Sequence, residues 1–530
     1  MPTHYLAIDL GAESGRVMLG TLEDARLALE ELHRFPNTPI AADGALTWDI
    51  PRLFDEVKAG LRIAAARRLP IAGMSTDSWG VDYMLFDATG ARMTPTFHYR
   101  DARTARGVGI VRSRLAWDTI FEETGIQFMP LNTIFQLAAE TPERLARAAH
   151  VVPIADAFNF MLSGVLRVDE SNASTTQLYN PRTRQWSRKL QESLGLPGRL
   201  FPPVVPCGTR LGPLRPDVMR DTGLPAVEVI ASCSHDTAAA VAAVPAENYS
   251  SDPGAAAPGT ARTLSSETGR AGDRRSEGDT AGPLHAGAAV PTWAYLSSGT
   301  WSLLGVELAC PVLTETCREL NFTNEIGYGG TVRLLRNIVG LWLVQECRRE
   351  WAKDGRGLDY PSLTKLATFA PPFVSLINPA DPRFVAPGGM PGKIAAFCRE
   401  TGQPEPSSTG ATIRCALESL ALLYRRTLRQ LEQLLGTRFE RLHIVGGGSR
   451  NGLLNQLTAN AVQLPVLAGP VEATALGNVA VQAVALGLLP SLGAAREIIR
   501  TSCHTVTFWP EAAVEWGRQA ARFERLPAQA

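Results

Sequence analysis

A short run of chemically active side chains, Ser234 to Thr237, follows an apolar segment and precedes a series of small residues. Phosphoryl transfer to an alcohol needs a positioned carboxylate that accepts the hydroxyl proton, and Asp236 could be that base. His235 could orient a sugar hydroxyl. The same residues also fit a structural role, because Asp or Ser before AAAVAAV would cap a helix and a lone histidine often only packs. The local sequence leaves both interpretations open.

Two distant segments, residues 5–20 and 293–306, each show an apolar strand, a turn of small residues and a second apolar strand. Turns of Gly, Ser and Thr let backbone N–H groups approach an anion closely. Asp9 precedes the first turn, where a phosphate-bound Mg²⁺ would find an oxygen ligand. Two such hairpins that face each other predict a two-domain enzyme that uses ATP and Mg²⁺.

A glycine run in HIVGGGSRN, residues 443–451, is followed by GPVEATALGNVAVQA, residues 469–483. Glycines between a strand and a helix let the backbone pass flat against a nucleotide, and the second helix start offers further N–H groups. The alternative is a tight strand-to-helix connection. The order of hairpin with Asp, second hairpin and glycine run favours the nucleotide.

The loop at residues 76–83 holds two carboxylates, an indole and a glycine between two strands. Carboxylates bind vicinal hydroxyls and aromatic faces cover C–H surfaces, so this loop could form a sugar-binding wall. The alternative is a solvated turn with Trp79 in the core. Further polar residues that could contribute are Asn132, Asn172 and residues 175–177.

Strands that alternate with helices predict an α/β layered fold. Strands are expected at 27–35 and 45–48, and a strand, a polar loop and a second strand at 71–87. Helices are expected at 51–67, 331–351, 412–435 and 451–462, and mostly helix at 131–163 around Pro153 and after about residue 490. Residues 227–244 read as strand, loop and helix, and 440–448 as a buried strand that ends in the glycine turn.

Composition narrows the class of protein. The chain has 530 residues, 45% of them apolar, and is longer than a single hydrophobic core usually supports, so two or more domains are expected. Its 52 basic and 52 acidic residues balance without a basic block, which argues against nucleic acid and anionic membrane and favours a small-molecule substrate. Without a long apolar segment, a cytoplasmic location is expected. The eight cysteines lack C-x-x-C spacing, so neither a zinc site nor a disulfide framework is indicated.

Residues 245–292 are rich in Pro, Gly, Ser, Ala and Thr and cannot bury enough apolar surface to offset chain entropy. We interpret them as a disordered insertion at the domain junction, with a flexible lid as the alternative. The expected organisation is an N-terminal domain at 1–244, a C-terminal domain at 293–490 and a helical tail at 491–530.

Six motifs together resemble the FGGY family of carbohydrate kinases, and within it the kinases that act on L-rhamnulose. They are DLGAESGR (9–16), DSWGVDY (77–83), SHDTAAA (234–240), YLSSGTWSLLG (295–305), LRNIVGLWLVQE (335–346) and HIVGGGSRN (443–451). The resemblance spans nearly the whole chain in the family's order, apart from residues 245–292. It implies two actin-like, ribonuclease H-like domains around a cleft, and ATP-dependent phosphorylation of L-rhamnulose at O1 in L-rhamnose catabolism.

The resemblance also implies roles for single residues. Asp236 would accept the proton, and Asp9 would lie near Mg²⁺ through water. Sugar contacts fall on Gly80, His235, Asp236, Thr237 and Asn337. ATP contacts fall on Ala12, Glu13, Ser14, Gly15, Arg16, Thr300, Gln345 and Gly447. Glu13 departs from the family's small residue, so its carboxylate must point away from the phosphates or ATP affinity should suffer.

Three other functions remain open. A sister kinase could act on fuculose, xylulose or glycerol, although DSWGVDY and the Thr237 that follows Asp236 favour a 6-deoxyketose over glycerol. An actin- or Hsp70-like ATPase switch would hydrolyse ATP whether or not sugar is present. A catalytically inactive sugar sensor is disfavoured because Asp9 and Asp236 are both intact.

Overall fold

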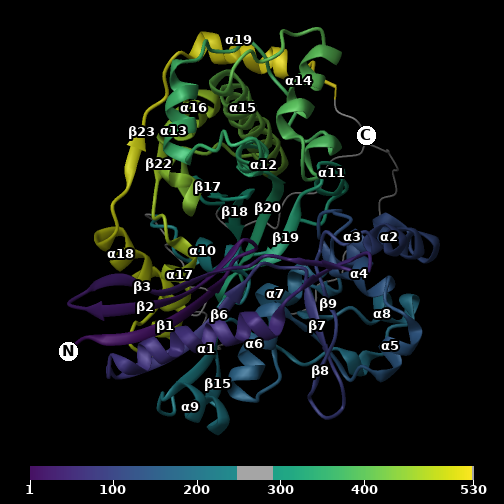
Figure 1. The fold of residues 1–530 in the computed structure, drawn as a ribbon, viewed down its shortest axis with the longest axis vertical. Helices are drawn as coiled ribbons and strands as arrows, with labels where there is room; N and C mark the ends of the chain where they lie inside the picture. Colours follow the sequence, from purple (N-terminus) through teal and green to yellow (C-terminus); the bar gives the residue numbers. More distant parts are fainter. Residues whose placement is uncertain (247–289, 528–530) are drawn as a thin grey trace, which may run out of the picture.

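The computed structural model describes residues 1–246 and 290–527, which form two halves, each built around a mixed sheet (Figure 1). The strand order is β15-β16-β6-β1-β2-β3 in the first sheet and β19-β20-β18-β17-β21-β22-β23 in the second. In each sheet three antiparallel strands adjoin two parallel ones, β3-β2-β1 beside β6-β16 and β20-β18-β17 beside β21-β22. This repeated order is the expected ribonuclease H-like fold.

The first half carries most of the short elements. Its strands are β1 (Thr3–Leu10), β2 (Ser14–Glu23), β3 (Arg26–Pro36), β4 (Ile40–Ala42), β5 (Ala45–Trp48), β6 (Ile71–Ser78), β7 (Tyr83–Phe86), β8 (Arg92–Met93), β9 (Thr96–Phe97), β10 (His150–Pro153), β11 (Val168–Asp169), β12 (Tyr179–Asn180), β13 (Gln185–Trp186), β14 (Val204–Val205), β15 (Thr209–Pro213) and β16 (Glu228–Ala231). Its helices are α1 (Ile50–Ala66), α2 (Arg103–Arg114), α3 (Trp117–Thr124), α4 (Thr133–Ala138), α5 (Pro142–Arg147), α6 (Ile154–Ser163), α7 (Glu170–Thr175), α8 (Arg188–Leu194), α9 (Pro216–Thr222) and α10 (Asp236–Ala242).

The second half has longer helices around its sheet. Its strands are β17 (Trp293–Ser298), β18 (Trp301–Leu308), β19 (Thr323–Ile326), β20 (Val332–Val339), β21 (Arg441–Val445), β22 (Val466–Ala468) and β23 (Val506–Phe508). Its helices are α11 (Glu315–Glu319), α12 (Trp342–Lys353), α13 (Tyr360–Phe369), α14 (Met390–Glu400), α15 (Thr409–Leu435), α16 (Gly452–Val462), α17 (Ala473–Ala485), α18 (Leu492–Ser502) and α19 (Ala513–Phe523).

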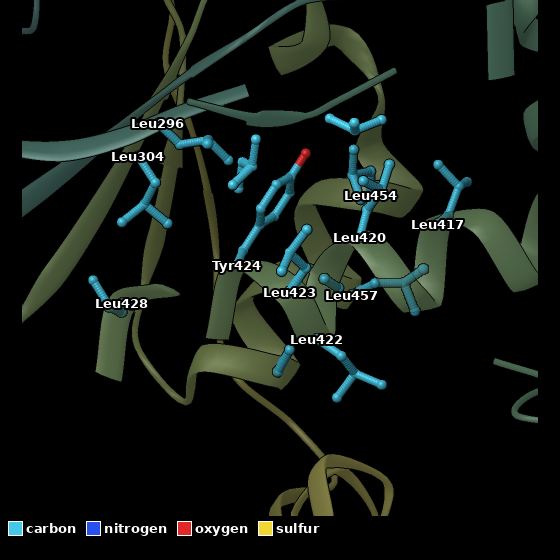
Figure 2. Packing of buried hydrophobic residues seen from close by; sticks show 14 of the residues in the cluster. Leu296, Leu304, Leu417, Leu420, Leu422, Leu423, Tyr424, Leu428, Leu454 and Leu457 are labelled. Atoms are coloured by element: carbon cyan, nitrogen blue, oxygen red, sulfur yellow. The ribbon is translucent and has the colours of Figure 1, made fainter. Parts of the chain in front are cut away.

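The core of the second half fixes the second hairpin, β17 and β18. Figure 2 shows Leu296 and Leu304 of this hairpin beside leucines of α15 and α16, with Tyr424 among them. The Tyr424 hydroxyl lies 2.7 Å from the Ser302 hydroxyl. Burial of a leucine side chain stabilises a fold by roughly 1.5–3 kcal/mol, so this cluster holds the hairpin rigidly at the cleft.

Helices α10 and α17 pack together and join the two halves. Their approach is close, because a Cβ atom at Gly477 would stand 1.8 Å from the carbonyl oxygen of Ala239. Gln482 of α17 donates a hydrogen bond to the Leu6 carbonyl of β1 at 3.0 Å. The two sheets are therefore tied to each other through one helix pair.

Two expected elements differ. The helix expected at 331–351 is wrong in its first part, where β20 occupies Val332–Val339 and α12 begins only at Trp342. The apolar residues of this segment fit helical spacing, but pairing with β18 on one side and β19 on the other fixes it as a strand. Within 131–163, the strand β10 pairs with β7 and interrupts the expected helices.

The other expected elements are present, including α1 at 50–66 and α15 at 409–435. Most of the expected insertion, residues 247–289, lies outside the described residues. After residue 490 the chain forms α18 and α19, with β23 between them as the edge strand of the second sheet. None of the helices within 1–246 and 290–527 combines the length and apolar content needed to cross a bilayer.

Candidate active site

A cavity of about 930 Å³ lies between the two halves and receives residues from both hairpins, the Asp236 loop and the glycine run. Nearly all the site residues expected from the sequence line it. From the first half these are Asp9, Ala12, Glu13, Ser14, Arg16, Gly80, His235, Asp236 and Thr237; from the second half they are Thr300, Asn337, Gln345 and Gly447. The structure therefore brings distant motifs together around one space.

Gly15 is the exception among the expected site residues, since it does not line the cavity. A Cβ atom at Gly15 would stand 2.2 Å from the ring of Phe35, which is buried on β3. Its lack of a side chain therefore serves the packing of the hairpin on the neighbouring strand. The phosphate-facing role expected for this residue would be left to its backbone.

Asp236 is the first residue of α10, and its side chain is 32% exposed toward the cavity. Asp236 is not the cap residue itself, because His235 occupies the cap position and makes no capping hydrogen bond through its side chain. The Thr237 hydroxyl donates to Asp236 Oδ1 at 3.1 Å. Burial and the nearby Asp9 carboxylate raise the pKa of Asp236 to about 7. A carboxyl group with that pKa is suited to accept a proton near neutral pH.

Three hydrogen bonds join the loop before Asp236 to neighbouring segments of the first half. Ser78 donates its N–H to the Ser234 carbonyl at 2.9 Å. The His235 N–H donates to the Ser171 hydroxyl at 3.1 Å, and the Ser234 N–H donates to Asp169 Oδ1 at 3.3 Å. The loop therefore has its backbone fixed before helix α10 begins.

The first hairpin places Asp9 directly opposite Arg16, and Asp9 also pairs in register with Asp77 of β6. The Arg16 guanidinium forms ion pairs with Asp9 and with Glu472 of the second half. Burial and the Asp9 charge raise the pKa of Asp77 well above its ordinary value. Asp77 accepts a hydrogen bond from Asn478 of α17 at 2.5 Å.

The same region has the donor chemistry for Mg²⁺. Within residues 1–246 and 290–527, no group of three or more His, Cys, Asp or Glu side chains is arranged as a complete metal site. Mg²⁺ in phosphoryl-transfer enzymes usually takes one or two carboxylates, with phosphate oxygens and water as its other ligands. Asp9 lines the cavity, and its charge reaches both Asp77 and Asp236. The residues present therefore fit a cation that arrives with a nucleotide.

Glu13 lies at the exposed tip of the first hairpin and points to the opposite wall, where it pairs with Arg349 of α12. Arg349 also pairs with Glu346 at 2.5 Å. The Glu13 carboxylate is thus compensated by a guanidinium from the second half.

The second hairpin and the glycine run form the other wall. Thr300 in the hairpin turn accepts a hydrogen bond from Gln345 Nε2 at 3.1 Å. Gly446 has φ +85°, a backbone conformation that favours glycine. A Cβ atom at Gly448 would stand 2.0 Å from Ser298 Oγ, whereas one at Gly447 would meet nothing within 4 Å. The chain at Gly447 can therefore approach a flat ligand closely.

Of the loop at 76–83, Trp79 and Gly80 line the cavity, and Trp79 is only 6% exposed. Neither carboxylate, Asp77 or Asp82, lines it, so the expectation that they bind hydroxyls there is wrong. Asp82, fully enclosed below it, accepts hydrogen bonds from Trp48 Nε1 at 2.6 Å, Trp79 Nε1 at 3.0 Å and Gln136 Nε2 at 2.9 Å. The second carboxylate of this loop therefore fixes the indole and does not face the ligand.

The remaining polar candidates divide between the cavity and the core. Asn132 and Thr175 line the cavity. Asn172 is buried against Asp156 at 3.2 Å, and Gln177 donates to the Ile126 carbonyl at 3.2 Å, so these two support the wall from behind. Residue 176 is also buried away from the cavity.

Several lining residues were not anticipated from the sequence. They are Tyr99, Ile126, Met129, Leu131, Glu325, Tyr360, Ile413 and Glu472. Asn337 lies between Gln127 and Glu325, with its backbone N–H 2.9 Å from Gln127 Oε1 and its Nδ2 atom 3.5 Å from Glu325 Oε1. Glu325 stands in β19, whose sequence TNEI is mostly polar, and nothing in that local sequence marks it as a site residue.

Family models and curated relatives both match nearly the whole chain. The N-terminal domain model of the FGGY family of carbohydrate kinases matches residues 4–243, and the C-terminal domain model matches 294–486. A rhamnulokinase of Bacteroides thetaiotaomicron is 40% identical over 529 residues, 99% of both chains. The rhamnulokinase of Bacillus subtilis is 35% identical over 507 residues, 96% of this chain and 95% of its own.

Solved structures show the same fold at low identity. A ligand-bound xylulose kinase from Lactobacillus acidophilus has a TM-score of 0.73 at 14% identity and covers 99% of this chain and 96% of its own. A Plasmodium falciparum glycerol kinase with ADP has a TM-score of 0.72 at 14% identity and covers 100% and 99%.

Proposed function

The chain belongs to the FGGY family of carbohydrate kinases, and on that premise we propose that it phosphorylates L-rhamnulose at O1. The products are L-rhamnulose 1-phosphate and ADP, in L-rhamnose catabolism, and the reaction has a cytoplasmic location. The observation that carries the proposal is Asp236, a carboxylate with a pKa raised to about 7 at the wall of a cavity between two opposed hairpins. The near full-length rhamnulokinase relatives support the choice of substrate.

Asp236 acts as the general base. As the sugar O1 attacks the γ-phosphorus, its hydroxyl proton passes to the Asp236 carboxylate and the bond to the leaving ADP oxygen breaks. Thr237 donates to Oδ1 and so leaves Oδ2 for that proton. His235, Gly80 and Asn337, which all line this cavity, contact the sugar.

The nucleotide lies along the two hairpins and the glycine run. Backbone N–H groups of the first turn hold the phosphates, together with the side chain of Arg16. Thr300 and Gln345 form the matching contact on the second half, and Gly447 lies under the nucleoside. The residues of the first turn in this role are Ala12, Glu13, Ser14, Gly15 and Arg16.

Asp9 would hold Mg²⁺ through water, and the bound cation supplies charge stabilisation for the phosphate oxygens. Closure of the two halves aligns the 1-hydroxyl with the γ-phosphorus and excludes water, which protects ATP from hydrolysis. We also propose the domain division 1–244 and 293–490, which the matched family ranges support. The helical tail expected at 491–530 instead continues the second half over its described residues, because β23 pairs with β22 and Trp516 and Phe523 join the core of that half.

An ADP-release assay over a set of acceptors tests this function. L-rhamnulose, L-fuculose, D-xylulose, glycerol and a sample without sugar are compared at one ATP concentration. The proposal predicts the highest kcat/KM with L-rhamnulose and little ADP without sugar. A higher kcat/KM with L-fuculose would show that L-fuculose, and not L-rhamnulose, is the substrate. ADP release at the same rate with and without sugar would indicate an ATPase switch.

A further inference from the structure

Arg333 on β20 is a fully buried guanidinium that does not itself line the cavity. It lies directly opposite Glu325 of β19 in the second sheet, and its Nη2 atom is 3.2 Å from Glu325 Oε2. Its Nε and Nη2 atoms each donate to the Ile326 carbonyl at 3.2 Å. Two strands of the second half therefore hold this side chain in one orientation.

The same Nη2 atom reaches the first half, where it lies 3.1 Å from His235 Nδ1. A guanidinium has only donors, so in this contact Nδ1 must be the acceptor. The single proton of a neutral imidazole then lies on Nε2. The Nε2 atom is 3.4 Å from Asp236 Oδ1.

We propose that Arg333 is a positioning residue that holds His235 in its Nε2–H tautomer, so that the single N–H of the imidazole lies on the side of Asp236 and the proposed sugar. The inference rests on the proposed function for its consequence, since it leaves Asp236 Oδ2 to receive the proton of the sugar hydroxyl. Arg333, which lies on the second half, would then help to orient the groups around the base on the first half.

The charges around the imidazole agree with this arrangement. Glu325 Oε2 is 3.4 Å from Nδ1, but Arg333 is closer to Nδ1 and already pairs with Glu325. Glu307, opposite Arg333 on β18, is paired with Arg496 at 2.6 Å. Burial and the Arg333 charge also hold the pKa of His235 well below its ordinary value, which keeps the ring neutral.

The tautomer can be measured without any substrate. In full-length protein labelled with ¹⁵N-histidine, the His235 signals are assigned by their loss in His235→Gln. We expect a protonated Nε2 and an unprotonated Nδ1. A protonated Nδ1 in the wild-type protein would overturn the proposal. Because this measurement needs no ATP or sugar, it decides the tautomer even if the proposed kinase activity is absent.

Variants of Arg333 test its control over the ring. In Arg333→Met, Glu325 becomes the partner nearest Nδ1, so the proton should move to Nδ1 and kcat should fall about tenfold to a hundredfold. Arg333→Lys keeps a buried donor and should retain the Nε2–H signal and more of the activity. An unchanged His235 spectrum in Arg333→Met would contradict the proposal.

Arg336→Met is the matched control, because it removes a guanidinium from the same strand. Arg336 pairs with Gln430 of α15 at 2.9 Å and does not line the cavity. We expect it to keep the wild-type tautomer and kcat. If it lowers kcat as much as Arg333→Met does, the loss reflects damage to β20 and the positioning role is wrong.

Discussion

Gly80 and His235 lie against each other: a Cβ atom at position 80 would stand 3.2 Å from the Nε2 atom of the imidazole and 3.1 Å from Thr175 Oγ1. Both distances are shorter than ordinary van der Waals contacts. A side chain at position 80 would therefore displace the imidazole next to the base. The absence of a side chain at Gly80 thus keeps the site in place, in addition to any role in the turn.

Gly80→Ala should lower kcat/KM for the sugar by at least about tenfold, because a shifted imidazole misplaces the acceptor hydroxyl. The KM for ATP should hardly change. Gly109→Ala on α2 is the control, since a Cβ atom there meets nothing within 4 Å. Steady-state kinetics with each substrate varied in turn measure the effect. Equal kcat/KM values for the sugar in the two variants would show that the contact between Gly80 and His235 does not position the sugar.

The pH dependence should report the base. Because the pKa of Asp236 is raised to about 7 and the base acts when ionised, kcat/KM for the sugar should fall as the pH drops through that region. The Thr237 hydrogen bond lowers this pKa, so Thr237→Val should move the midpoint to higher pH. Thr237→Ser keeps the hydroxyl and should keep the midpoint. A midpoint that moves downward in Thr237→Val would contradict the assignment.

Asp9 should govern the response to Mg²⁺. Asp9→Asn removes the carboxylate that we propose holds Mg²⁺ through water, so more Mg²⁺ should be needed for half-maximal rate and kcat should fall by more than about tenfold. Asp55→Asn, whose side chain is 72% exposed on α1, serves as the control for a lost charge. Superimposable Mg²⁺ titrations of Asp9→Asn and the wild type would exclude this role.

The Glu13 and Arg349 pair should act on ATP binding as a unit. Arg349→Met leaves the Glu13 carboxylate uncompensated at the proposed phosphate site, so the KM for ATP should rise about twofold to fivefold, in the range of an exposed ion pair. Adding Glu13→Ser should return the KM toward the wild-type value. If the double variant binds ATP as weakly as Arg349→Met, then Arg349 contacts the nucleotide itself.

The sequence identified the parts of the site whose chemistry is local. The hairpin turns, the Asp236 loop and the glycine run carry short motifs, and the fold brings them to one cavity. Gly15 was expected at the phosphates, but its distinguishing contact is with Phe35, which depends on the pairing of β2 and β3.

The positions that escaped prediction depend on strand register. The apolar residues Leu335, Ile338 and Val339 fit a helix as well as a strand, and only the neighbours β18 and β19 decide between them. Once β20 is a strand, Arg333 falls opposite Glu325 and can reach His235. No local pattern announces such a pair, because its members come from separate segments of the chain.

The role of Asp236 as the proton acceptor is the centre of this account, and turnover by Asp236→Asn on L-rhamnulose tests it most directly. With folding checked by thermal unfolding and ATP binding, kcat should fall at least about a hundredfold while the KM for the sugar changes far less. Turnover close to that of the wild type by a folded Asp236→Asn protein would contradict it.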